Sequence, residues 1–173
     1  MMLRFAGLVL VTMLVGCQVV PAETPDPAAI PSGSVEARGP AAIGPVVELG
    51  SGSSGGIGWR YAAYESDDGW CTQLETQSVT EAGCGQLLPA DDAAFGSVSH
   101  SGQIVHGTVS AETATVWLLD DGGVRVAFAT LMPLEPAGLE GLAFVGIAEA
   151  GAELTHVMAV KLNGEILETY ELP

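Results

Sequence analysis

Short runs of apolar and β-branched residues alternate with turn residues along the chain beyond position 45. In one run, Val124, Val126 and Phe128 alternate with Arg125 and Ala127, which is the period-2 pattern of a half-buried strand. Other runs, such as "LAFVGI", are apolar throughout, as expected where two sheets pack over a strand. No run of a dozen residues shows the period of a helix, so the pattern predicts an all-β chain.

These runs predict about nine short strands. They cover residues 45–49, 57–66, 70–77, 103–110, 113–119, 124–131, 142–149, 154–162 and 165–172. Three gaps between them carry the turn sequences "DDG" (67–69), "DDGG" (120–123) and "NG" (163–164). Asp-Gly and Asn-Gly favour tight hairpin turns because these residues tolerate positive φ. We therefore predict three hairpins in an antiparallel β-sandwich, with a small barrel as the alternative.

The N-terminal residues 1–16 have the pattern of a signal peptide. Arg4 is followed by eleven uncharged, mostly apolar residues from Phe5 to Val15. This run fits a secretory hydrophobic region and is too short for a membrane-spanning helix, which needs roughly 20 residues. The pattern thus predicts an exported chain. No later segment approaches that length, so we expect the rest of the chain not to be an integral membrane domain.

The residues Leu14-Val15-Gly16-Cys17 resemble the lipobox of bacterial lipoproteins. The resemblance implies cleavage before Cys17, a diacylglycerol on its sulfur and an acyl chain on its new amino group, with no other cofactor. Two or three acyl chains anchor a protein durably, whereas one does not. Gln18, rather than Asp, implies the outer membrane if the source has one. The alternatives are a plain signal peptide with an incidental cysteine, or an uncleaved anchor.

Residues 17–45 have the composition of a flexible linker. The stretch is rich in Pro, Ala, Gly and Ser and shows no sustained apolar period. It is expected to hold the body of the protein away from the membrane. We therefore divide the chain into a signal peptide (1–16), a lipidated cysteine with its linker (17–45) and one β-sandwich domain (46–173).

Charge excludes two classes of partner. The chain has 21 acidic and five basic residues, with a formal net charge of −16 and a single lysine. Binding to nucleic acid depends on Lys and Arg side chains that neutralise phosphates, so we expect no nucleic-acid partner. Polybasic adhesion to anionic lipids is excluded for the same reason, which leaves the lipid anchor as the membrane contact.

Cys71 and Cys84 form an even pair in a chain that we expect to be exported, and such a pair predicts a disulfide. It would close a loop of roughly 14 residues and stabilise the fold by about 3 kcal/mol. A metal-binding pair is the alternative. It is disfavoured because the twelve intervening residues exceed the short ligand spacing of zinc sites.

The stretch "ELGSGSSGGIGW" (48–59) contains the glycine spacing of a dinucleotide-binding turn and of a nucleophile elbow. Both motifs require a helix after the turn. Here the following residues alternate as a strand does, so neither motif is predicted. We interpret the stretch as a flexible connection between the first strand and the rest of the domain.

The other candidates for chemistry are weak. The Asp-Asp doublets at 67–68, 91–92 and 120–121 lack the alternating spacing of a calcium loop, and we interpret them as solvated turns. His100, His106 and His156 show no zinc-binding spacing, and three serines near His100 do not by themselves make a triad. We predict no metal site and no catalytic residue.

Among the aromatic residues, most are expected in the core, including Trp59 and Trp117. Tyr64 and Trp70 flank a predicted turn and are our candidates for exposed, ligand-facing residues. The segment from Trp59 to Cys71 and the following "GCG" also resemble part of certain exported proteins of high-GC bacteria, a resemblance that implies no activity.

The sequence therefore favours a membrane-anchored lipoprotein whose β-domain faces outside the cytoplasm and binds an envelope protein or a glycan, without catalysis. One alternative is an envelope hydrolase with a site assembled from the loops 78–102 and 132–141, because long loops often carry function. Another is a structural accessory subunit of an envelope complex.

Overall fold

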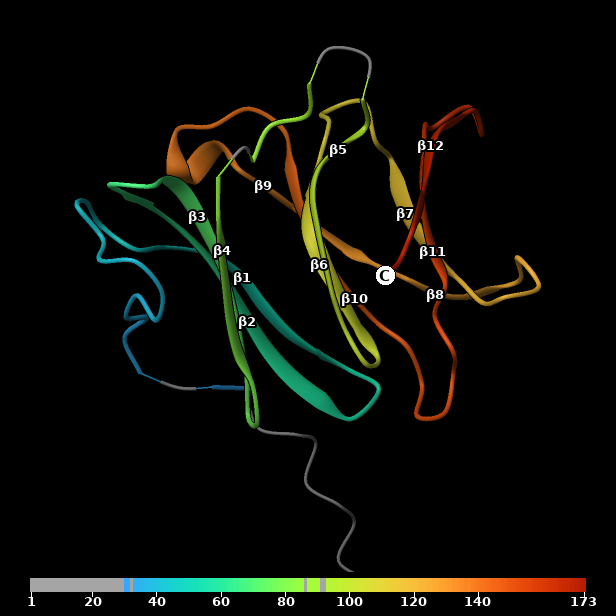
Figure 1. The fold of residues 1–173 in the computed structure, drawn as a ribbon, viewed down its shortest axis with the longest axis horizontal. Helices are drawn as coiled ribbons and strands as arrows, with labels where there is room; N and C mark the ends of the chain where they lie inside the picture. Colours follow the sequence, from blue (N-terminus) through green and yellow to red (C-terminus); the bar gives the residue numbers. More distant parts are fainter. Residues whose placement is uncertain (1–29, 32, 86, 91–92) are drawn as a thin grey trace, which may run out of the picture.

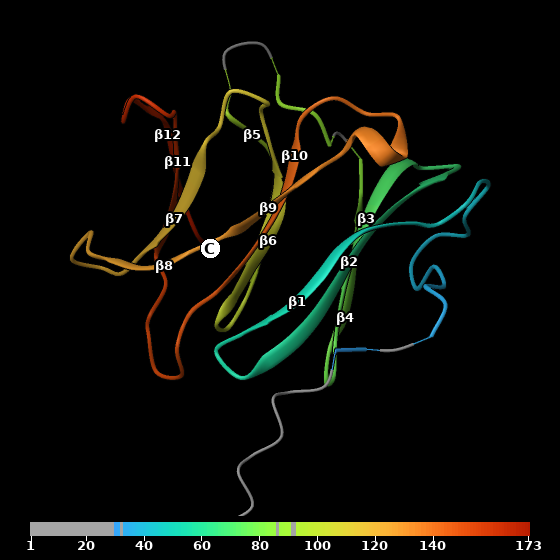
Figure 2. The ribbon, with the colours of Figure 1, turned by 180° about the vertical axis from the view of Figure 1, so that it is seen from behind.

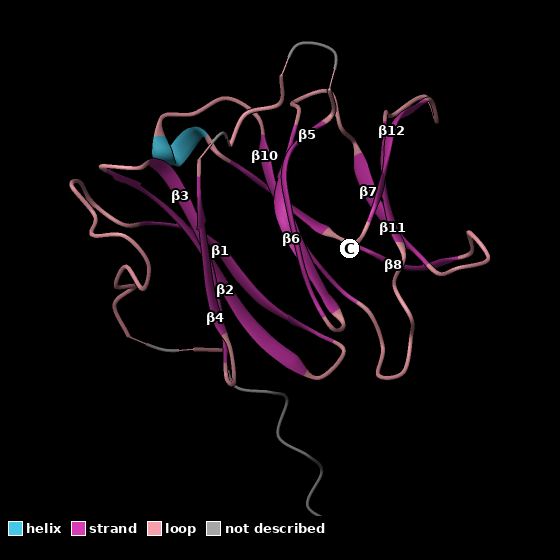
Figure 3. Cartoon of the chain, in the orientation of Figure 1, coloured by secondary structure: helices cyan, strands magenta, loops and turns pink. Residues whose placement is uncertain are grey.

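The structure is a computed structural model that describes residues 30–31, 33–85, 87–90 and 93–173 (Figure 1). The predicted signal peptide and Cys17 lie outside these residues. The fold is all-β, with one short 3-10 helix, η1 (Glu135–Ala137) (Figure 3). Twelve strands follow one another: β1 (Val47–Ser54), β2 (Ile57–Ser66), β3 (Gly69–Thr76), β4 (Thr80–Cys84), β5 (Phe95–Ser101), β6 (Ile104–Val109), β7 (Thr115–Leu119), β8 (Arg125–Phe128), β9 (Thr130–Pro133), β10 (Leu142–Ile147), β11 (His156–Val160) and β12 (Ile166–Glu171).

The strands form three antiparallel ladders of four strands. Sheet A has the order β1-β2-β3-β4, sheet B the order β5-β6-β10-β9, and sheet C the order β12-β11-β7-β8. Strands β8 and β9 are separated only by Ala129, whose N–H donates to the carbonyl of Val116 at 2.9 Å. The chain thus passes from sheet C to sheet B without a loop, and the two ladders make one curled sheet (Figure 2). This sheet has seven strands when β8 and β9 are counted as one continuous strand.

Glu168 brings the two ends of this curled sheet together. Its carboxylate, on β12, accepts the N–H of Ala94 at 2.6 Å and that of Phe95 at 3.1 Å, where β5 begins. The rings of Phe95 and Tyr170 also meet there, with centroids 6.1 Å apart. Sheets B and C therefore approach a closed barrel. Sheet A packs against sheet B as in a sandwich, and the predicted antiparallel all-β fold is confirmed.

Sheet B is buried on both faces, because alternate residues of its strands point into two different cores. Val105, Val109 and Phe144 point into the barrel between sheets B and C. Val145 and Ile147 point toward sheet A, where they meet Trp59, Tyr61 and Leu74. This double burial explains why the "LAFVGI" run is apolar throughout.

The three predicted hairpins are confirmed, since β2–β3, β7–β8 and β11–β12 pair as antiparallel neighbours. Turn side chains bond the backbone: Asp120 Oδ1 accepts the N–H of Val124 at 2.8 Å, and Asn163 Oδ1 accepts that of Glu165 at 3.0 Å. Two further strands, β4 and β5, occur where the pattern predicts none. Their sequences "TEAGC" and "FGSVSHS" are short of large apolar residues.

The stretch 48–59 is not a flexible connection, and that interpretation is wrong. It forms β1, a tight turn and the start of β2, with Ser54 paired to Ile57. The turn residues Gly55 and Gly56 have φ of 56° and 77°. A two-residue hairpin with positive φ at both positions favours glycine, because a side chain there would be strained. The glycines serve a hairpin, and a strand follows them.

The described end of the predicted linker is docked rather than free. We call residues 33–43 the strap, because they run along sheet A on the side away from sheet B (Figure 1). Arg60 Nη1 donates to the carbonyl of Gly33 at 2.6 Å. Gln73 makes two bonds, accepting the N–H of Arg38 at 2.7 Å and donating to the carbonyl of Glu36 at 3.0 Å.

The strap ends in strand-like pairing. Ile43 donates its N–H to the carbonyl of Glu65 at 2.9 Å, and Ala42 forms an isolated bridge with Ser66. Within 17–45, the prediction of a flexible linker is therefore wrong for the strap. The remainder of that range lies mostly outside the described residues.

Candidate functional site

A polar chain of three residues runs between sheets A and B, with two of its members buried and the third partly exposed. Tyr61 Oη on β2 lies 3.3 Å from His106 Nδ1 on β6, and His106 Nε2 lies 3.2 Å from Glu81 Oε2 on β4. A carboxylate can only accept, so Nε2–H donates to Glu81 and the Tyr61 hydroxyl donates to Nδ1. The sequence shows no zinc-binding spacing at His106 and does not predict its partners, which come from other strands.

Burial sets the protonation of this chain. Burial lowers the pKa of His106, and the hydrogen bond and charge of Glu81 oppose that shift. Burial also raises the pKa of Tyr61 well above its ordinary value. Both groups are thus neutral near pH 7. Tyr61 is fully buried and His106 is 2% exposed, whereas Glu81 is 30% exposed. Glu81 is therefore the member of the chain that is in contact with solvent.

The structure corrects one of the two proposed ligand-facing residues. Tyr64 is fully buried, and its hydroxyl has no hydrogen-bond partner within the described part of the chain. It lies beneath the strap, where a Cβ on Gly39 would approach the hydroxyl within 2.8 Å. Trp70, at the start of β3, is half-buried.

Cys71 and Cys84 form the predicted disulfide. They are directly paired residues of β3 and β4, so the bond fastens the edge strand that carries Glu81. The disulfide therefore supports the polar chain and also the edge of sheet A.

The three histidines do not converge. His100 Nε2 donates to the carbonyl of Gly102 at 2.9 Å, and His156 Nδ1 lies 2.9 Å from the hydroxyl of Thr155. Ser97, one of the serines near His100, is hydrogen-bonded to Thr108 at 3.0 Å. Within the described residues, no group of three or more His, Cys, Asp or Glu side chains could hold a metal ion.

Two shallow cavities lie beside the loops that the sequence marks as long, and only the first has residues of both loops in its wall. One, of about 280 Å³, has Leu88 and Pro89 on one side and Glu140 on the other. The adjoining one, of about 540 Å³, is lined by Glu135 and Glu140. A third, of about 490 Å³, lies elsewhere and has His100 and Glu153 in its wall. These side chains supply carboxylates and one imidazole.

The outer face of sheet C combines aromatic, apolar and charged residues. Leu118 on β7 and Val157 on β11 point into the barrel. Successive residues of a strand point to opposite faces, so the residues on either side of them point outward. We define the outer face of sheet C by two cross-strand rows: Arg125, Leu119, His156, Glu171 and, beside it, Phe128, Trp117, Met158, Thr169.

Arg125 stands out on this face. Its guanidinium carbon lies 5.0 Å from the ring centroid of Trp117 and 4.3 Å from that of Phe128, within cation–π range. The aromatic contacts hold the guanidinium plane, which leaves its N–H groups able to bind a carboxylate in a two-point geometry. Phe128 is 56% exposed.

Arg125 makes no ion pair within the described residues, although the chain is strongly acidic. Two other cations are paired: Arg60 with Glu75, and Lys161 with Glu112 and Glu165. An exposed arginine held between two aromatic rings without a carboxylate is typical of an interaction surface, where Arg and Trp are enriched.

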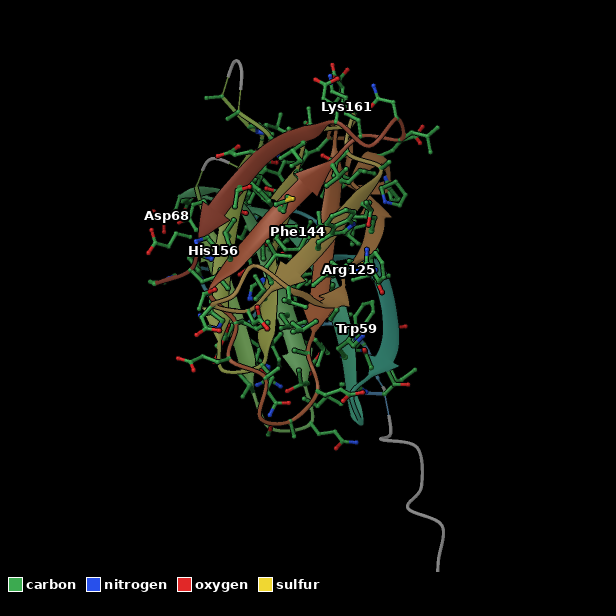
Figure 4. The ribbon with its side chains drawn as sticks, turned by 90° about the vertical axis from the view of Figure 1, so that its right-hand side faces the viewer. Trp59, Asp68, Arg125, Phe144, His156 and Lys161 are labelled. Atoms are coloured by element: carbon green, nitrogen blue, oxygen red, sulfur yellow. A yellow bond between two sulfur atoms is a disulfide. The ribbon has the colours of Figure 1, made fainter. Side chains whose placement is uncertain are left out.

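The outer face of sheet C and the strap lie on opposite sides of the domain (Figure 1). Viewed from the sheet C side, Arg125 on the edge strand β8 and His156 on the inner strand β11 lie apart on the sheet (Figure 4). A chain tethered through the strap therefore presents sheet C on the side away from the strap.

Comparison with protein-family models, with curated proteins and with solved structures found no match to this chain. Within the described ranges, no helix is long and apolar enough to cross a membrane.

Sequence reasoning missed Arg125. Alternation predicts Arg125 and Ala127 on one face of the strand and Val124, Val126 and Phe128 on the other. This is wrong for Phe128 and Ala127, because an irregularity in the register between Leu118 and Leu119 brings Arg125 and Phe128 to the same outer face. The two rings come from adjacent strands, however, and only the register of β7 with β8 places Trp117 opposite Phe128.

Proposed function

We propose that this protein is a lipoprotein, anchored in the membrane through acyl chains on Cys17, whose β-domain serves as a non-catalytic interaction module outside the cytoplasm. The lipobox resemblance supports the anchor. The observation that carries the interaction role is the exposed Arg125, stacked on Trp117 and Phe128 without an ion pair in the described chain.

The strap supports a defined orientation. Because it is docked on sheet A, only residues 18–32 remain to span the distance from Cys17 to the domain. Fifteen residues reach about 45 Å if extended as polyproline, and less as a flexible coil. Sheet C lies on the far side of the domain from this tether, so it is the surface presented to partners.

Membrane fractionation of the Cys17→Ala chain tests the anchor. We expect the native chain to partition with lipid, and the variant to be released or to accumulate unprocessed. Mass spectrometry of the native chain should find acyl chains on Cys17. A free thiol at Cys17 would contradict the proposal.

Cysteine labelling of isolated membranes tests the interaction surface. We expect Thr169→Cys, on the outer face of sheet C, to be protected from a maleimide reagent. Glu153→Cys is the control, because Glu153 is exposed on the loop between β10 and β11. Equal labelling of the two positions would show that sheet C is not covered.

A second candidate function is an envelope hydrolase at the two adjoining cavities along the loop 133–141, one of which is also lined by residues 88–90. The observation that favours it is the meeting of these two segments, with Glu135 and Glu140 in the wall. Turnover of a glycan or peptide substrate that Glu135→Gln and Glu140→Gln each abolish would establish it. Turnover that survives both changes would remove it.

A further inference from the structure

The row that contains Arg125 carries opposite charges at its two ends. Its order across the sheet is Arg125 on β8, Leu119 on β7, His156 on β11 and Glu171 on β12. Arg125 and Glu171 are both exposed. They are three strand spacings apart, which is about 14 Å, and therefore too far apart to pair within one chain.

The adjacent row is suited to close packing. It contains Phe128, Trp117, Met158 and Thr169, again from β8 to β12. Phe128 is 56% exposed, and so is Ile166, which lies one row further along β12. A polysaccharide has no aliphatic side chains to cover such residues, whereas a protein surface does. The observations thus favour a protein partner with a carboxylate near its edge.

We propose that the partner is a second copy of this chain, packed outer face of sheet C against outer face of sheet C. The inference rests on the proposed function, since it names the partner of the same surface. The two copies are related by a two-fold axis that runs parallel to the strands, between β7 and β11. Such an interface uses one surface twice and must therefore be complementary to itself.

This axis makes the surface self-complementary. It exchanges β8 with β12 and β7 with β11, so that Arg125 of each copy faces Glu171 of the other. By the same operation, Trp117 faces Met158. Two ion pairs thus flank a centre in which His156 of each copy lies over the buried Leu119 of the other, beside the Trp117–Met158 contacts. The sheets would be about 10 Å apart, with their strands within about 30° of alignment.

The arrangement also agrees with the proposed anchor. Rotation about an axis leaves the position along that axis unchanged, so the straps of the two copies lie at the same level. Because each strap lies on the far side of its own domain from sheet C, neither obstructs the interface (Figure 1). Two chains anchored in one membrane can therefore pair.

Charge reversal tests the pairing directly. The full chain, purified in detergent, is examined by size-exclusion chromatography with multi-angle light scattering at about 0.15 M salt, where the Debye length is about 8 Å. We expect a dimer for the native protein. Arg125→Glu and Glu171→Arg should each raise the dimer dissociation constant about tenfold or more, because each change places like charges together at two symmetric positions. The double variant should restore the dimer.

Two control variants separate the interface from general charge effects. Arg38→Glu reverses an exposed arginine of the strap that makes no ion pair in the described chain, and Glu153→Arg reverses an exposed glutamate outside sheet C. Both should leave the dimer unchanged. Circular dichroism confirms that each variant is folded.

A native monomer at about 100 μM, or a dimer that Arg125→Glu leaves intact, would overturn the inference. So would failure of the double variant to recover the dimer while both single variants lose it. If the native chain is monomeric but Thr169→Cys is still protected in membranes, another protein covers sheet C, and the proposed interaction role stands without the second copy.

Discussion

Tyr61 on β2 and His106 on β6 meet across the interface of sheets A and B, with 3.3 Å between Oη and Nδ1 and ring centroids 5.5 Å apart. Glu81 bonds the other ring nitrogen of His106. A neutral histidine between a hydroxyl donor and a carboxylate acceptor has both nitrogens satisfied, so this contact ties sheet A to the barrel without a buried charge on the imidazole.

Acid should weaken the fold through His106. Its pKa is lowered because burial disfavours the imidazolium, while Glu81 offsets only part of that effect. In the unfolded chain, this histidine binds a proton near the ordinary histidine pKa of about 6.5, whereas in the folded chain it binds one only at lower pH. The free energy of unfolding therefore falls as the pH drops below about 6.5. Urea denaturation at pH 7.5 and pH 5.5 should show this loss, and His106→Gln should reduce it.

The control for that measurement is His100→Gln, since the His100 ring bonds only the nearby Gly102 carbonyl among the contacts described for it. This variant should keep the native loss of stability between the two pH values. An equal loss in the native chain and in His106→Gln would show that His106 is not the group responsible.

Reduction of the disulfide should destabilise the domain. The bond between Cys71 and Cys84 closes a loop with a sequence separation of 13 residues, for which the chain-entropy estimate is about 3 kcal/mol. Cys71→Ala/Cys84→Ala should show a similar decrease in the free energy of unfolding by urea denaturation. A double variant as stable as the native chain would contradict a stabilising role for the bond.

Gly107→Ala should disrupt the barrel. An added Cβ at Gly107 would collide with the backbone carbonyl of Ser97 on the paired strand β5, which cannot move aside as a side chain can. We expect a loss of about 3 kcal/mol, typical of overpacking. Gly83→Ala is the matched control, since nothing lies within 4 Å of its added Cβ. Its effect should stay within about 0.5 kcal/mol, and thermal denaturation of both variants checks the difference.

Gln73→Leu should loosen the strap. The buried Gln73 amide accepts the N–H of Arg38 and donates to the carbonyl of Glu36, and leucine can do neither. Loss of a bond of about 1.4 kcal/mol corresponds to about tenfold faster amide exchange at Arg38. Hydrogen exchange followed by NMR measures it. The N–H of Ala129, which bonds the carbonyl of Val116 in the barrel and lies outside the strap, serves as the internal reference, and an unchanged rate at Arg38 would contradict this account.

Local chemistry made much of the fold predictable. Alternation identified most strands, and the turns at Asp120 and Asn163 formed as predicted because their side chains bond backbone only two to four residues away. Cys71 and Cys84 were paired correctly because they are the only cysteines beyond the lipobox. The strand β5 was missed because its serines lack the apolar pattern, and its pairing depends on β6.

The all-β class, the hairpins and the disulfide could be derived from the amino-acid sequence, since each rests on residues close together in the chain or on a count of residue types. Three contacts emerge only from the folded arrangement: the strap covers Tyr64, His106 meets Tyr61 and Glu81, and Arg125 stacks on Trp117. These contacts join segments far apart in the sequence or on separate strands. Strand register and sheet packing determine which of these segments come into contact, and neither can be predicted from a local sequence pattern.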